Sequence, residues 1–277
     1  MTTELRLSVT LPASSTTYLD LAAILSAANH RLYRQSYLYK AEFRIDGDVG
    51  TGIGVDEQFV VDVLPTSWPM MKALKQAKEM AVASQMPERD AIQIARWNDF
   101  RMYYDTTHKG QAFVQLPDGI SMTLGSDSEL AYTQVFDDVG LPYVFTALDN
   151  SVVTGAGRSF GALYEYDRTG DTSTTNAPQG NDYDRILNDL NDANETEISQ
   201  NGDLPPYNKD TLQVPSKQYQ LFAFGSSVPN VGYSVRTTGL VDVPHGLVKV
   251  ANNIDAPRNL IIRFKAGKYK GVHAEAL

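Results

Sequence analysis

One serine stands in a pattern that could support nucleophilic catalysis. Residues 157–161 read GRSFG, which matches G-x-S-x-G, the pattern that places a serine at a sharp strand-to-helix turn beside a histidine and an acid. Ser159 is followed by Asp203 and then by His245, the chain order of such hydrolases. Residues 162–166 alternate like a strand, however, where that turn requires a helix. We therefore expect Ser159 to be a turn or strand residue, and no residue to be catalytic.

The usual ligand sets for metals and cofactors are also missing. The four histidines are scattered, there is no cysteine, and GTGIG at residues 50–54 lacks the last glycine of a dinucleotide fingerprint. Acidic side chains crowd residues 182–197 and could offer oxygen ligands to calcium, but not in the order of an EF-hand. We interpret them as a solvated acidic face, and we expect no metal and no cofactor.

Basic and aromatic residues alternate at residues 30–40, HRLYRQSYLYK. Such a run can bind single-stranded nucleic acid, because bases stack on aromatic rings while cations meet phosphates. Alternatively, the tyrosines pack in a core, and Arg31 and Arg34 share one exposed helix face. A second basic cluster lies near the end of the chain, where Arg263 and Lys265 alternate with apolar residues, so one sheet face should be cationic. The candidate nucleic-acid-facing residues are Arg31, Tyr33, Arg34, Tyr37, Lys40, Arg263, Lys265, Lys268 and Lys270.

Short alternating segments dominate the pattern that must position these residues. A strand is predicted over residues 5–11, and Thr17-x-x-Asp20 resembles a capping box that would start a helix ending at about Gln35. Alternation returns at residues 37–45 and 59–63, which we expect to pair through the glycine-rich turn between them. A helical insertion follows at about residues 66–98, with an interruption at Pro87.

Further short strands are predicted along the rest of the chain, at residues 100–104, 112–114, 120–124, 131–136, 162–166, 218–224, 233–235, 247–250 and 260–264. About a dozen strands separated by Gly, Pro, Asn and Asp turns favour an all-β sandwich or jelly roll over a parallel α/β sheet. We expect a single domain over residues 1–277.

Charge is distributed unevenly along this chain of 277 residues. It has 24 Lys and Arg against 33 Asp and Glu, which argues against a free nucleic-acid-binding domain. Residues 165–210 hold 11 acidic and 3 basic residues, so we expect an acidic surface excursion at about residues 167–215, with a polar helix near 183–196. The apolar runs are too short for a membrane span, and no membrane partner is expected.

Three segments resemble one protein family. They are LSAANHRLYRQSYLYKAEFRI (25–45), ARWNDFRMYYDTTH (95–108) and IIRFKAGKYKGVHA (261–274), and they resemble the jelly-roll capsid (coat) proteins of small circular single-stranded DNA viruses. The resemblance implies a single jelly roll that binds copies of itself, forms an icosahedral shell around the genome in the virion, and has no enzymatic step. The acidic excursion would then face outward and the basic residues inward, toward a polyanion.

One departure concerns the start of the chain. Members of that family commonly begin with an arm rich in Arg and Lys, whereas Arg6 is the only basic residue before His30 here. Genome contact would then be weak and made by the folded basic face, or neutralisation would depend on small cations or a separate packaging protein. The alternative function is a carbohydrate-binding or hydrolytic β-sandwich protein that uses tyrosines with Trp68 or Trp97 as a sugar platform.

Overall fold

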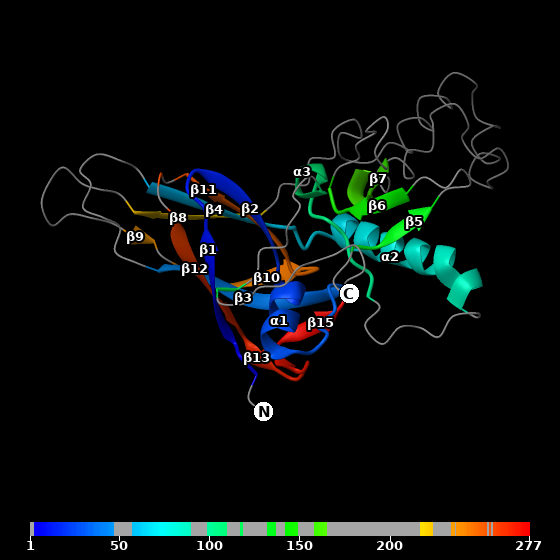
Figure 1. Cartoon of the computed structure of the whole chain (residues 1–277), viewed down its shortest axis with the longest axis horizontal. Coiled ribbons are helices and arrows are strands. Elements are labelled where there is room, and N and C mark those ends of the chain that lie inside the picture. The colour runs from blue at the N-terminus through cyan, green and yellow to red at the C-terminus, as the bar shows by residue number, and fades with distance from the viewer. Residues whose placement is uncertain are drawn as a thin grey trace, which may run out of the picture.

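The computed structural model describes residues 3–46, 57–89, 99–109, 117–118, 132–136, 142–148, 158–164, 217–223, 234–235, 237–253, 255 and 257–277. This part of the chain is mostly β, and its two large sheets are antiparallel, in agreement with the predicted all-β class. The two sheets face each other across a shared apolar core (Figure 1).

The strands in the described part of the chain form four sheets. The first large sheet has the spatial order β1 (Arg6–Leu11), β12 (Arg258–Phe264), β3 (Tyr37–Asp46) and β10 (Thr237–Pro244), with β15 (Ala274–Ala276) also beside β3. The second has the order β2 (Ser15–Asp20), β11 (Leu247–Asn252), β4 (Glu57–Val63), β8 (Lys217–Ala223) and β9 (Ser234–Val235). The small sheets are β13 (Ala266–Gly267) with β14 (Gly271–Val272), and β5 (Gln134–Phe136) with β6 (Pro142–Thr146) and β7 (Arg158–Gly161).

The long strands pair in a nested order. In chain order they are β1, β2, β3, β4, β8, β10, β11 and β12, and the first pairs with the last, the second with the seventh, the third with the sixth, and the fourth with the fifth. Two further pairings, β12 with β3 and β11 with β4, join these pairs into the two large sheets. A long antiparallel ribbon rolled onto itself has this connectivity.

Alternating apolar residues explain why these segments form strands. Val9 of β1 and Ile262 of β12 are fully buried on the inner face of the first sheet, and Val61 of β4 and Val250 of β11 are fully buried on the second. Successive side chains of a strand point to opposite faces, so one face of each sheet contributes to the shared core. Burial of this apolar surface is the main force holding the two sheets together.

Three helices complete the described elements: α1 (Leu21–Asn29), α2 (Trp68–Arg89) and α3 (Thr106–Lys109). Helix α2 extends past Pro87, where an interruption was predicted, and residues 90–98 lie outside the described residues. Its buried side, including Leu74 and Ala77, packs in a second apolar cluster with Phe100, Phe145 and Leu163. Figure 1 shows α2 beside β5, β6 and β7 at one end of the sandwich.

The prediction for residues 17–35 was wrong in two respects. Residues 15–20 form strand β2, and α1 begins only at Leu21, because the Asp20 carboxylate caps it by accepting a hydrogen bond from Ala23 N at 3.0 Å. Helix α1 ends at His30, whose φ of 51° is left-handed, well before Gln35. The strand was missed because its residues 17–20 are all buried, which removes the alternation.

Several other predicted strands also need correction. Strands β3 and β4 were expected to pair, but they lie in different sheets, since β3 pairs with β12 and β10 while β4 pairs with β11 and β8. Residues 100–104 contain an isolated bridge at Tyr103 instead of a strand, and residues 162–164 are helical. The strands predicted at 112–114 and 120–124, the acidic excursion at 167–215 and its helix near 183–196 lie outside the described residues.

Strand β1 has one neighbouring strand in the described part of the chain, and Asp118 covers its other edge. Asp118 N donates to Ser8 O at 2.8 Å. The carboxylate accepts hydrogen bonds from Ser8 Oγ at 2.7 Å and from Thr10 N and Oγ1 at 2.9 and 2.8 Å. Burial raises the pKa of Asp118, but these hydrogen bonds outweigh burial and bring the pKa below its ordinary value. The bonds satisfy backbone groups that an edge strand would otherwise expose.

We predict that Asp118→Ala lowers the free energy of unfolding by about 1 kcal/mol at pH 7, because charged hydrogen bonds to β1 are lost. Since the folded pKa of Asp118 is depressed, its contribution is present above the unfolded pKa and disappears as the pH falls through the folded pKa. Urea unfolding at pH 7 and at pH 3 measures both effects. Glu79→Ala, on the exposed face of α2, is the control. Equal losses at the two pH values would contradict this account of the edge.

Candidate nucleic-acid interface

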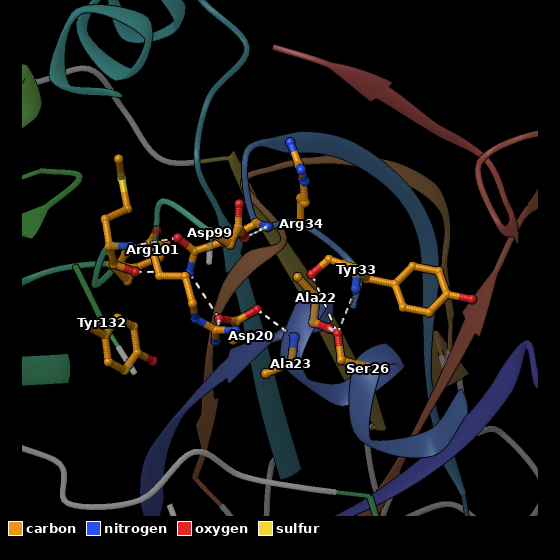
Figure 2. Close-up of polar contacts among 12 residues, drawn as sticks. Asp20, Ala22, Ala23, Ser26, Tyr33, Arg34, Asp99, Arg101 and Tyr132 are labelled. Carbon is orange, nitrogen blue, oxygen red and sulfur yellow. Dashed lines mark hydrogen bonds and ion pairs between the residues drawn. The ribbon is translucent and has the colours of Figure 1, made fainter. Parts of the chain in front are cut away.

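The segment between α1 and β3 carries the first group of predicted basic and aromatic residues. It leaves α1 at His30 and is fastened back onto the helix by Ser26 (Figure 2). Ser26 Oγ accepts a hydrogen bond from Tyr33 N at 2.8 Å and donates one to Ala22 O at 2.6 Å. Arg31 and Arg34 therefore lie in this segment after the end of α1, and the predicted shared helix face does not exist.

A buried polar network positions this segment. Gln35 is fully buried, and its Nε2 donates to Asp20 Oδ2 at 2.9 Å and to Met102 O at 3.0 Å. Its Oε1 accepts a hydrogen bond from Met102 N at 2.6 Å. The Asp20 carboxylate is also ion-paired with Arg101, whose side chain is fully buried (Figure 2). One carboxylate thus caps α1, neutralises Arg101 and orients Gln35.

Backbone groups of the segment between α1 and β3 also hydrogen-bond to the side chains of Asp99, Tyr269 and Tyr39. Gln35 N donates to Asp99 Oδ2 at 2.7 Å, and Arg34 N donates to the hydroxyl of Tyr269 at 3.1 Å. The hydroxyl of Tyr39 donates to Arg34 O at 2.6 Å. Because Tyr269 belongs to the turn between β13 and β14, these bonds bring the C-terminal basic cluster next to the first one.

Aromatic rings complete the contact between the two clusters. Tyr37 stacks on Tyr269 with ring centroids 4.2 Å apart, and Tyr33 meets Tyr269 edge-on at 5.9 Å. The Lys270 ammonium lies 5.8 Å from the ring centroid of Tyr33 and 5.5 Å from that of Tyr269, and it donates to Leu32 O. The hydroxyl of Tyr33 in turn donates to Lys270 O at 2.9 Å. The two distant stretches of sequence therefore form one surface.

We call this surface the basic corner; it comprises Arg31, Arg34, Tyr37, Lys268, Tyr269 and Lys270. Its four cationic residues are exposed, and among the described residues none of them forms an ion pair with a carboxylate. Burial lowers the pKa of Lys270, and the nearby charges of Arg34 and Arg31 lower it further. Cations that repel one another and form no ion pair with a carboxylate favour binding of an anion.

The other predicted residues have different surroundings. Tyr33 is fully buried, so it offers no surface for stacking on a base. On the outer face of the first sheet, Lys40 pairs with Asp242 at 3.0 Å and Arg263 Nη1 lies 3.8 Å from Glu42 Oε2, while Lys265 is exposed. The sheet face predicted to be cationic therefore carries compensating acids. The basic corner is the better candidate interface.

A second polar cluster lies around His108. Its ring stacks on Tyr18 at 4.7 Å, and its Nδ1 accepts a hydrogen bond from Tyr104 N at 3.0 Å. Burial lowers the pKa of His108 to about 4. The hydroxyl of Tyr18 donates to Asp105 Oδ2 at 2.7 Å, and Lys249 Nζ lies 3.5 Å from the same oxygen. These groups satisfy one another in the interior, and in the described ranges no three His, Asp or Glu side chains are grouped to hold a metal ion.

Ser159 lies within strand β7 and is 2% exposed. Residues 162–164 of the predicted strand 162–166 are helical, and residues 165–166 lie outside the described residues. Ser159 precedes this helical stretch inside β7 and does not occupy the turn itself. His245 is buried beside Phe100, with a pKa lowered to about 3 by burial, and Asp203 lies outside the described residues. This geometry lends no support to a nucleophile at Ser159.

Sequence reasoning missed the residues that position the basic corner. The sequence pattern placed Asp20 in a capping box starting at Thr17 and predicted the end of a helix at Gln35. Asp99 and Arg101 lie in or next to residues 100–104, where the alternation of apolar residues predicted a strand and gave no sign of a buried polar network. The spacing of Tyr269 between Lys268 and Lys270 was the available clue, because it repeats the mixing of aromatic and basic residues seen at residues 30–40.

We predict that Arg101→Met lowers the free energy of unfolding by about 3–5 kcal/mol, since it leaves the Asp20 carboxylate buried without its cation. Asp20→Asn alone keeps a residue able to cap α1. The double variant should lose less than the sum of the two single losses, because no uncompensated charge is then buried. Chemical denaturation of all four proteins measures this coupling. Strict additivity would show that the ion pair does not organise the network.

Within the described residues, no helix combines the length and the apolar character needed to cross a membrane. Comparison with protein-family models, with curated proteins and with solved structures finds no match to this chain. Its function therefore has to be inferred from the strand order and from the basic corner.

Proposed function

We propose that this protein is a viral coat subunit of the jelly-roll type, which assembles with copies of itself into an icosahedral shell around nucleic acid in the virion. The observation that carries the proposal is the nested pairing of the eight long strands, β1 with β12, β2 with β11, β3 with β10 and β4 with β8. A jelly roll is an eight-stranded double sheet built from two Greek keys, and viral coat proteins use it often. Helix α2 and strands β5 to β7 then form an insertion between the fourth and fifth of these strands.

Self-association is supported by what the surface exposes. Trp68 and Met80 on α2, Tyr164 after β7, and Leu240 on β10 are large apolar residues exposed in the described part of the chain. Aromatic residues and methionine are enriched in protein interfaces. The chain has no cysteine, so contacts between copies would be non-covalent, and reducing agents should not affect them.

The basic corner supports the proposal that the shell contains nucleic acid. Arg31, Arg34 and Lys268 are exposed and lack carboxylate partners in the described residues, and the half-buried rings of Tyr37 and Tyr269 lie among them. Phosphates satisfy such cations with release of counterions, and aromatic rings accept stacked bases. Because the corner is small, each subunit contributes a weak contact, and a shell presents many copies of it.

We predict that the purified protein forms closed shells that persist in reducing agent. Light scattering over a range of salt and pH, together with negative-stain images, measures this. A protein that stays monomeric under all these conditions would contradict the coat proposal. Monomers that bind polysaccharide would instead support the alternative sandwich function, with exposed Trp68 as a platform.

Charge reversal at the basic corner should reduce packaging. We predict that Arg31→Glu combined with Lys268→Glu leaves shells intact but lowers the nucleic acid recovered per particle by about tenfold, because each lost phosphate contact weakens binding and the new carboxylates repel the polymer. Lys72→Glu combined with Lys75→Glu, on the exposed face of α2, makes the same charge change elsewhere. The ratio of phosphate to protein in purified particles measures the outcome. Equal losses in both double variants would mean that overall charge, and not the corner, determines packaging.

A further inference from the structure

Asp99 joins the buried network to the basic corner. Its Oδ2 accepts the hydrogen bond from Gln35 N at 2.7 Å, and the preceding amide, Arg34 N, is bound by the hydroxyl of Tyr269 at 3.1 Å. The successive amides of Arg34 and Gln35 are thus bound by the side chains of Tyr269 and Asp99. Of these two side chains, only the Asp99 carboxylate can change its charge near neutral pH. Figure 2 shows Asp99 between Arg101 and the segment that carries Arg34.

Charged and titratable groups from several elements act on this carboxylate. Burial raises the pKa of Asp99 to about 6, and the Asp20 carboxylate at the end of β2 raises it as well. The hydrogen bond from Gln35 N and the charges of Arg101 and Arg34 lower it without cancelling the effect of burial. Asp99 in turn acts on Tyr39 of β3 and on Tyr269 and Lys270 of the C-terminal turn. Two carboxylates therefore share one buried arginine, and the negative charge of Asp99 is stabilised first by the hydrogen bond from Gln35 N, then by Arg101, and also by Arg34 of the basic corner.

We propose that Asp99 makes polyanion binding at the basic corner dependent on protons: the ionised carboxylate weakens binding, and the protonated carboxyl strengthens it. This inference rests on the proposed role of the corner as a nucleic-acid interface. When Asp99 is ionised, its negative charge reduces the positive potential at Arg34 and Lys270, where phosphates would bind. When Asp99 is neutral, this negative charge is absent, the net charge around the corner is more positive by one unit, and the affinity for a phosphate polymer rises by about threefold.

The thermodynamic linkage between proton binding and polyanion binding provides a second test of the proposal. If a polyanion binds more tightly to the protonated form, then the bound polyanion must favour protonation by the same factor, and the pKa of Asp99 must rise on binding. A purely structural role for Asp99 predicts no such change. This second readout does not depend on whether the protein forms shells.

Two histidines lie near the corner and are replaced first, so that the test reports on Asp99 alone. His30 precedes Arg31, and His273 follows the β13–β14 turn and lies 3.7 Å from Glu275. His30→Asn suits the left-handed backbone at that position, since asparagine adopts it readily. His273→Gln keeps a polar side chain of similar size. The variant carrying both substitutions is the background for the test.

The probe is a thymidine oligonucleotide of about 20 residues, which keeps the same charge between pH 5 and pH 8. We expect the background protein to bind it about threefold more tightly at pH 5 than at pH 8, by fluorescence anisotropy at fixed ionic strength. Asp99→Asn added to this background keeps an acceptor for Gln35 N and should bind with nearly the same affinity at both pH values, close to the pH 5 affinity of the background. Glu79→Gln in the same background should keep the pH dependence.

The carboxyl resonance of Asp99, followed by carbon NMR, should titrate at a higher pH when the oligonucleotide is present. A pH dependence that survives Asp99→Asn, or a titration of Asp99 that the oligonucleotide leaves unchanged, would overturn the inference. The coat proposal would fail separately, if no shells form while the Asp99-dependent binding is observed.

Discussion

The buried ion pair between Asp20 and Arg101 is the contact on which the candidate interface depends. A carboxylate and a guanidinium lose their hydration when they are buried, and they are stable there only if their partners are in place. Asp20 stands at the junction of β2 and α1, while Arg101 lies in the irregular stretch at residues 99–102, between α2 and α3. The pair therefore joins the second sheet, the cap of α1 and the irregular stretch at residues 99–102 in one place.

The position of the basic corner follows from that junction. The side-chain amide of Gln35 hydrogen-bonds to Asp20 on one side and to the backbone of Met102 on the other. These bonds fix the course of the segment between α1 and β3. The turn between β13 and β14 then supplies Tyr269 and Lys270, whose side chains hydrogen-bond to Arg34 N and Leu32 O of that segment. The fold holds the exposed cations of the corner close together, so they repel one another. Binding of an anion would relieve this repulsion, which favours binding.

The sequence predicted those parts of the fold that depend on local patterns. Strands β1, β3, β8, β11 and β12 were found because their apolar residues alternate. Strand β2 was missed because both of its faces are buried near α1, and the β3–β4 pairing was wrongly predicted because sequence neighbours need not be sheet neighbours. At the site, the mixing of tyrosines with Arg and Lys identified the first half of the basic corner, and the cluster of basic residues near residue 270 identified the second half, without Tyr269. Their contact, and the roles of Asp20, Gln35, Asp99 and Arg101, depend on residues far apart in the chain and have no local signal.

If the coat proposal is right, nucleic acid contacts this protein at the basic corner. Ultraviolet cross-linking of the purified protein to a thymidine oligonucleotide, followed by mass spectrometry of the digested complex, tests it directly, because aromatic side chains stacked on bases cross-link efficiently. The account predicts cross-links at Tyr37 and Tyr269 and none at Tyr33, which is fully buried. Cross-links concentrated at Trp68 on α2, with Tyr37 and Tyr269 unmodified, would contradict it.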